Sequence, residues 1–104
     1  MHDFQKVFIY IRIVFKIMVS LEVIRRSFIN FINELSEKAG KKLSNKEIRN
    51  YPREIEIFIR LLEEKGFWNE AGELKSVNVT LKKNNVVDKK TIKRLREILV
   101  KLNE

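Results

Sequence analysis

The chain has no cysteine, one proline, one histidine and only three glycines among its 104 residues. The lack of cysteine excludes disulfides and thiolate metal sites, and it agrees with a reducing, cytoplasmic location. Proline and glycine are concentrated in turns and loops, so their scarcity predicts short connections and a helix-rich domain. The glycines are scattered at positions 40, 66 and 72, so the chain has no glycine-rich loop of the kind that holds nucleotide phosphates.

Groups that carry out catalysis are equally scarce. The only histidine, His2, lies at the terminus, so neither a histidine general base nor a histidine metal triad can be assembled within one chain. Glu73-Leu74-Lys75 matches half of a metal-dependent nuclease motif, but the partner aspartate is missing because the only aspartates are Asp3 and Asp88. We therefore predict a protein that is not an enzyme, with no catalytic residue, no metal site and no cofactor.

The overall composition of the chain is typical of one folded domain. Apolar residues make up 44% and charged residues 35% of a chain that is long enough to bury a core. The many Ile, Lys and Glu residues resemble the composition of thermophilic proteins.

The first 20 residues are unusually apolar. Residues 8–19 read FIYIRIVFKIMV, a run that is too short to span a membrane and is interrupted by Arg12 and Lys16. No membrane association is therefore predicted. The odd-numbered positions of this run are all apolar, which suits a strand, although a helical face is also present. Three alternatives stay open for residues 1–20: a strand, an interface for a homodimer or a larger complex, or an extension upstream of a natural start at Met18.

From Leu21 onward, apolar residues recur at three- and four-residue steps, which predicts an amphipathic helix that ends at Gly40. Ser44 and Glu47 have the spacing of a capping box and predict the start of a short helix. Because proline disfavours helical geometry at the preceding residue, we expect this short helix to end before Pro52. Pro52 then occupies the first turn of a further helix, which ends at Gly66.

A β-hairpin is predicted after Gly66. Phe67 and Trp68 are expected to fold back onto the preceding helix as part of the core. After a turn at residues 69–73, the segment 74–81 alternates apolar with polar residues, as a half-buried strand does. The pair Asn84-Asn85 tolerates the positive φ of a tight turn, and residues 86–87 are expected to return as a short strand.

This order of elements, with a third helix that ends in LLEEKGF before a hairpin, resembles the winged helix-turn-helix family of DNA-binding domains over roughly residues 21–81. The resemblance implies an α+β fold, a single winged-helix-like domain over residues 21–104 with a β-hairpin and a basic C-terminal helix. It also favours DNA over RNA as the partner, although the sequence alone does not decide between them. A sequence-specific repressor of this kind would need Arg49, Arg53 or Arg60 to reach base edges.

Positive charge is concentrated in the last third of the chain. Residues 75–104 hold nine Lys or Arg against three acidic residues, whereas residues 41–74 hold seven of each. Asp88 is expected to cap a final helix whose core face is Ile92, Leu95, Leu99 and Leu102. The residues predicted to contact nucleic-acid phosphates are Lys75, Lys82, Lys83, Lys89, Lys90, Lys93, Arg94 and Arg96. The same pattern also fits a solvated lysine-rich helix or a surface that binds an acidic protein.

Two functions follow from these observations. The first is a cytoplasmic, non-catalytic nucleic-acid-binding protein, either a DNA-binding accessory factor or a transcriptional regulator, that uses the basic C-terminal surface. The second is an interaction subunit of a larger polymerase or ribonucleoprotein complex that docks through residues 1–20.

Overall fold

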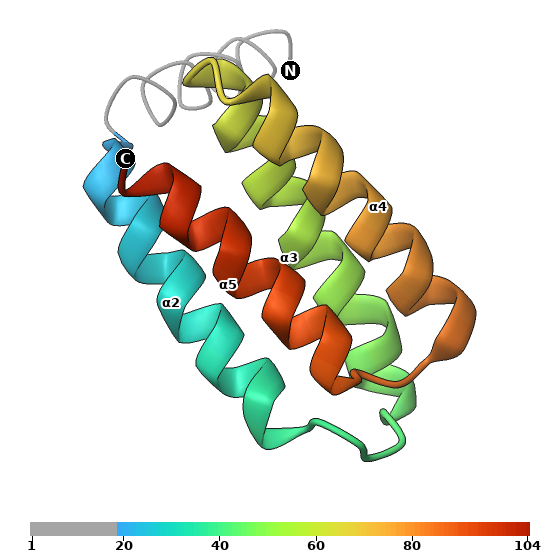
Figure 1. Ribbon diagram of the computed structural model, residues 1–104. Helices are drawn as coiled ribbons and strands as arrows, with labels where there is room; N and C mark the ends of the chain where they lie inside the picture. Colours follow the sequence, from blue (N-terminus) through green and yellow to red (C-terminus); the bar gives the residue numbers. More distant parts are fainter. Residues whose placement is uncertain (1–18) are drawn as a thin grey trace, which may run out of the picture.

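Within residues 19–104, which the computed structural model describes, the chain forms four helices and no strand. They are α2 (Leu21–Glu37), α3 (Asn45–Glu64), α4 (Trp68–Asn84) and α5 (Lys89–Leu102). Consecutive helices run in opposite directions as an up-down-up-down bundle (Figure 1). Helix α3 packs mainly on α4, and α2 packs mainly on α5, so the bundle consists of two helix pairs laid against each other. The alternatives predicted for residues 1–18 lie outside the described residues.

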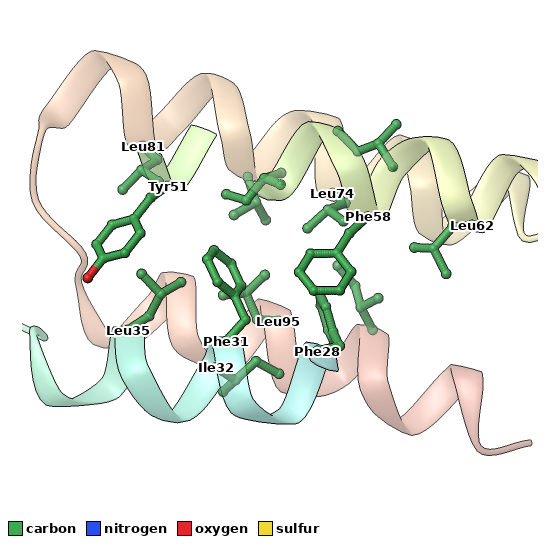
Figure 2. Close-up of a cluster of buried hydrophobic side chains, with 14 of the residues drawn as sticks. Phe28, Phe31, Ile32, Leu35, Tyr51, Phe58, Leu62, Leu74, Leu81 and Leu95 are labelled. Carbon is green, nitrogen blue, oxygen red and sulfur yellow. The ribbon is translucent and has the colours of Figure 1, made fainter. Parts of the chain in front are cut away.

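The core lies between the two helix pairs. Figure 2 shows aromatic and leucine side chains from α2 and α5 meeting those of α3 and α4. Phe28 of α2 meets Phe58 of α3 edge to face, with ring centroids 5.2 Å apart, and Phe31 of the same helix contacts both Phe58 and Tyr51. The predicted amphipathic helix of residues 21–39 is confirmed, because its apolar stripe is buried in this core.

The predicted β-hairpin is wrong, and with it the α+β fold class and the resemblance to winged-helix domains. Residues 68–84 form α4, in which Ala71, Leu74, Val77 and Leu81 are buried at three- and four-residue steps. The alternation that predicted a strand placed Val79 on the same face as Val77, yet Val79 is 66% exposed and Val77 is fully buried. Because α3 offers a long apolar face, the helical stripe of α4 buries more apolar surface than a two-stranded wing would.

The predicted break before Pro52 is also wrong. Helix α3 runs unbroken through Pro52, although proline cannot donate the hydrogen bond that the Ile48 carbonyl would otherwise accept. Tyr51 and Pro52 are themselves buried, and Ile55 continues the same apolar stripe one turn later. Burial of this stripe along the whole length of α4 outweighs the loss of one backbone hydrogen bond. The amide of Asn78 on α4 donates to the Pro52 carbonyl at 3.4 Å.

The two loops at one end of the bundle are joined by backbone hydrogen bonds. The amide of Gly40 donates to the Val87 carbonyl at 2.8 Å, and the amide of Leu43 donates to the Asn85 carbonyl at 3.3 Å. The short strand expected at residues 86–87 is therefore only a single bridge between Lys42 and Val86. Gly40 (φ +78°) has the predicted left-handed conformation, and Asn85 (φ 56°) also has a positive φ. We call this end, where α2 meets α3 and α4 meets α5, the loop end.

The capping box at Ser44 is confirmed and has a measurable consequence. The Ser44 amide donates to the Glu47 carboxylate at 2.8 Å, and the Glu47 amide donates to the Ser44 hydroxyl at 3.2 Å. The hydrogen bond from the Ser44 backbone, followed by the contact with Lys38, lowers the pKa of Glu47 from 4.5 to about 2. Because the folded state favours the ionised carboxylate, this interaction stabilises the protein above about pH 4.5 and is lost as the pH falls towards 2.

We therefore expect the side-chain carboxyl carbon of Glu47 to show no titration in an NMR pH series between pH 7 and 3. In the same series, a short unstructured glutamate peptide serves as the comparison. A Glu47 midpoint near 4.5 would contradict the hydrogen-bonding arrangement of the capping box.

Candidate nucleic-acid interface

Helix α5 presents the densest group of cations in the part of the chain that the structure describes. The Asp88 carboxylate caps this helix by accepting from both the amide and the hydroxyl of Thr91 at 2.7 Å. These hydrogen bonds lower the pKa of Asp88, which keeps the cap ionised. Ile92, Leu95 and Ile98 turn the opposite face into the core, so the cations of α5 are directed outward. The predicted core face was right except that Ile98 is fully buried while Leu99 is only partly buried.

Three of the eight predicted phosphate-binding residues already have a protein partner. Lys75 lies 3.7 Å from the Glu63 carboxylate, and Lys82 lies 3.5 Å from that of Glu56, so both pair with α3. Arg94 donates to the Ser76 hydroxyl on α4 at 3.0 Å. Lys101, which was not among the predicted residues, is held by Glu73 at 2.7 Å. These side chains contribute to the packing of α4 against its neighbours and are less available to a ligand.

The other five predicted residues are exposed and form no ion pair with the described part of the chain. They are Lys83, Lys89, Lys90, Lys93 and Arg96. Lys89, Lys90 and Lys93 belong to the first two turns of α5, and Lys83 lies in the last turn of α4, so these four are at the loop end. Arg96 lies at the middle of α5, about 10 Å from the start of the helix.

The loop end adds two cations that sequence reasoning missed. Lys41 and Lys42 lie between Gly40 and Leu43, whose amides bond to the α4–α5 loop. The bridge from Lys42 to Val86 places this lysine pair beside the start of α5, although almost 50 residues separate them in sequence. From the sequence, Lys41-Lys42 served only as a stop for the first helix, and nothing local pointed to α5 as their neighbour. We call Lys41, Lys42, Lys83, Lys89, Lys90, Lys93 and Arg96 together the basic surface.

The arginines proposed for base contacts lie elsewhere. Arg49, Arg53 and Arg60 are exposed on α3, in the helix pair opposite to that of α5. Arg60 shares a shallow pocket with the carboxylates of Glu56 and Glu63. Arg49 lies in the second turn of α3, near the loop end, whereas Arg60 lies about three turns further along the helix, so the three arginines do not form one cluster.

Trp68 is also separate from the basic surface. Its side chain is 65% exposed, so the prediction that it belongs to the core is wrong, whereas its neighbour Phe67 does pack partly against the core. Trp68 begins α4 and Lys83 lies near the end of that helix, which separates them by roughly 22 Å at 1.5 Å per residue. An exposed tryptophan can stack on a base or anchor a protein contact, but here it lies far from the cations.

Acidic side chains gather on the α2–α3 side of the bundle. A pocket there is lined by Glu34, Glu47 and Glu54 with Tyr51, and α2 and α3 are less closely packed than the other neighbouring helices. Burial, followed by the charge of Glu34, raises the pKa of Glu54. Burial and the surrounding carboxylates also raise the pKa of Tyr51, whose hydroxyl donates to Glu47. Lys38 and Lys46 also line this pocket, and Lys38 pairs with Glu47 at 3.2 Å, so its three carboxylates are partly neutralised.

The E-x-K half-motif is not assembled into a site. On helix α4, Glu73 turns to Lys101 of α5 and Lys75 turns to Glu63 of α3, so the two side chains point to different neighbours. Among residues 19–104, no group of three or more side chains is arranged to bind a metal ion.

The chain has no match among known protein families, curated proteins or solved structures. The basic surface is therefore interpreted from its own geometry. Over the same described residues, no helix combines the length and the apolar character needed to cross a membrane.

Proposed function

We propose that this protein binds nucleic acid without catalysing a reaction, by contacting the phosphate backbone with the basic surface. One observation carries the proposal: seven exposed cations from the α2–α3 loop, the last turn of α4 and α5 lie at or near one end of the bundle. None of them is within ion-pair distance of a carboxylate among the described residues, although Lys90 lies near enough to Asp88 to help lower the pKa of that carboxyl. A lysine that already holds a carboxylate must give up that contact before it can bind a phosphate. The unpaired cations have no such contact to break, so they can neutralise phosphates and release counterions directly.

The geometry favours backbone contacts over base readout. Lysine makes up six of the seven cations, and lysine acts as a point charge rather than as the planar fork that reads guanine edges. The helix that carries most of them also uses its other face to hold α2 and α4 together, which anchors the surface on a rigid element. Binding that varies little with base sequence is the expected result, as for an accessory factor in the cytoplasm.

A salt series tests the proposal. Affinities of the full chain for labelled duplex DNA, single-stranded DNA and RNA of equal length would be measured by fluorescence anisotropy. If four or five of the seven cations meet phosphates, log K falls against log salt with a slope of about −3.5 to −4.5 for duplex DNA. The affinity then drops by roughly 100-fold or more between 50 and 200 mM salt. Binding that is absent at 50 mM salt, or that does not change with salt, would overturn the proposal.

A further inference from the structure

An apolar groove runs along the outside of the α2–α5 pair. It has a volume of about 490 Å³ and is lined by Ser36 and Ala39 from the end of α2 and by a stripe of α5. The stripe comprises Lys89, Ile92, Lys93, Arg96, Glu97 and Val100. Ala39, Ile92 and Val100 supply its apolar floor, and Val100 is 59% exposed although it is a large aliphatic side chain.

Exposed apolar surface extends beyond the groove towards the other end of the bundle. The Arg25 guanidinium donates to the Leu102 carbonyl, which sets the register between the antiparallel helices α2 and α5. Ile29 lies one turn after Arg25 and is 40% exposed, so it lies at about the level of Ile98, two residues before Val100. From Lys89 to Val100 the stripe rises by roughly 16 Å, or about three helical turns.

The two walls of the groove differ in charge. Lys89, Lys93 and Arg96 follow one another at i, i+4 and i+7 along α5, and none is ion-paired within residues 19–104. The α2 wall is neutral at Ser36 and Ala39, and Glu97 is the only carboxylate that lines the groove. Phosphates would use the three cations, but a nucleic-acid backbone has no apolar side to cover Val100 and the partly exposed Ala39.

A ligand that contacts both the row of cations and the apolar floor carries negative charge beside an apolar edge. A helix of about three turns has the matching length, and its apolar residues at i, i+4 and i+7 can enter a groove between two helices. Acidic residues on the flank of such a helix would meet Lys89, Lys93 and Arg96, where pairing also fixes its orientation.

We infer that the α2–α5 groove binds an acidic amphipathic helix of a partner protein. The inference goes beyond the proposed nucleic-acid binding and does not depend on it, because it relies on the apolar floor as well as on the cations.

The test uses a synthetic helical peptide of about 14 residues, with Leu at three positions spaced i, i+4 and i+7 and with Glu and Ala elsewhere. Its binding to the full chain is followed by fluorescence anisotropy, and the contact site is mapped by backbone amide shifts in NMR. We expect saturable binding with the largest shifts at Ala39, Ile92 and Val100. A second peptide, in which every Glu is replaced by Lys, is expected not to bind.

Two matched variants separate the groove from the rest of the surface. Val100→Glu places a carboxylate on the groove floor and should weaken peptide binding by at least roughly 10-fold. Val79→Glu is the same change at a residue that is 66% exposed on α4, outside the groove, and should leave peptide binding within about twofold. Both variants change the net charge equally, but Val100 lies one turn from Arg96 of the basic surface, so Val100→Glu should lower the affinity for duplex DNA slightly more than Val79→Glu.

Three results would overturn the inference: no saturable binding up to about 1 mM peptide, equal effects of the two variants, or tighter binding of the lysine peptide. A fourth result would also overturn it by identifying a different occupant. If the protein is a dimer in solution and Val100→Glu alone makes it a monomer, the groove is covered by a second copy of the chain. Failure of the peptide test with intact salt-dependent DNA binding would leave the proposed function standing.

Discussion

Reversing the charge of Lys90 and Lys93 together is expected to weaken duplex DNA binding on the order of 100-fold in 50 mM salt. Each phosphate contact contributes about 0.9 to the slope of log K against log salt, so the loss of two contacts should also make the slope shallower by about 1.8. Both lysines are exposed on α5 and neither is ion-paired within the described part of the chain. The double variant Lys90→Glu/Lys93→Glu should therefore fold normally, which circular dichroism would verify.

The matched control is Arg49→Glu/Arg53→Glu. It changes the net charge by the same amount at two exposed positions on α3, which belongs to the helix pair opposite to that of α5. Here we expect no more than a few-fold loss of affinity and a salt slope close to that of the unmodified protein, because only long-range attraction is reduced. Equal losses from the two variants would show that overall charge, rather than the basic surface, attracts the nucleic acid. A larger loss from the α3 variant would restore Arg49 and Arg53 as contact residues.

The second large effect is on stability. Phe28→Ala is expected to lower the free energy of unfolding by about 3–5 kcal/mol, the usual cost of removing a buried phenylalanine. Phe28 is fully buried, and its ring packs edge to face on Phe58, which itself contacts Phe31. These rings join α2 to α3 across the core, so truncating Phe28 removes the edge-to-face contact with Phe58 and leaves a cavity among buried side chains.

Urea denaturation followed by circular dichroism measures this effect, with Ile29→Ala as the control on the same helix. Ile29 is 40% exposed, and its truncation should cost about 1 kcal/mol or less. If Phe28→Ala were no more destabilising than Ile29→Ala, the packing of α2 on α3 described here would be wrong.

The sequence predicted the elements whose signals are local. The capping box at Ser44 and Glu47, the positive φ of Gly40 and the Asp88 cap of the last helix each depend on residues within a few positions of one another. Such features form in the same way wherever the segment is placed, because their hydrogen bonds close within one turn.

Two predictions failed where tertiary packing decided the outcome. The segment 74–81 has both a period of two and a period of three to four, and only the apolar face of α3 selects the helix. Pro52 is a helix breaker by local rules, yet the apolar stripe that continues on both of its sides is buried against α4 and keeps α3 in one piece. In each case the free energy gained by burying a long apolar stripe is larger than the free energy of the local conformational preference of a few residues.

The same distinction applies to the candidate interface. The sequence alone showed an excess of cations in the last third of the chain, and caps and apolar spacings located the starts of α2, α3 and α5. Which cations are free was decided only by the tertiary structure, because ion pairs such as Lys82–Glu56 and Lys101–Glu73 join residues 26 and 28 positions apart. The tertiary structure alone also brought Lys41 and Lys42 to α5, since backbone hydrogen bonds between two loops cannot be read from either loop by itself.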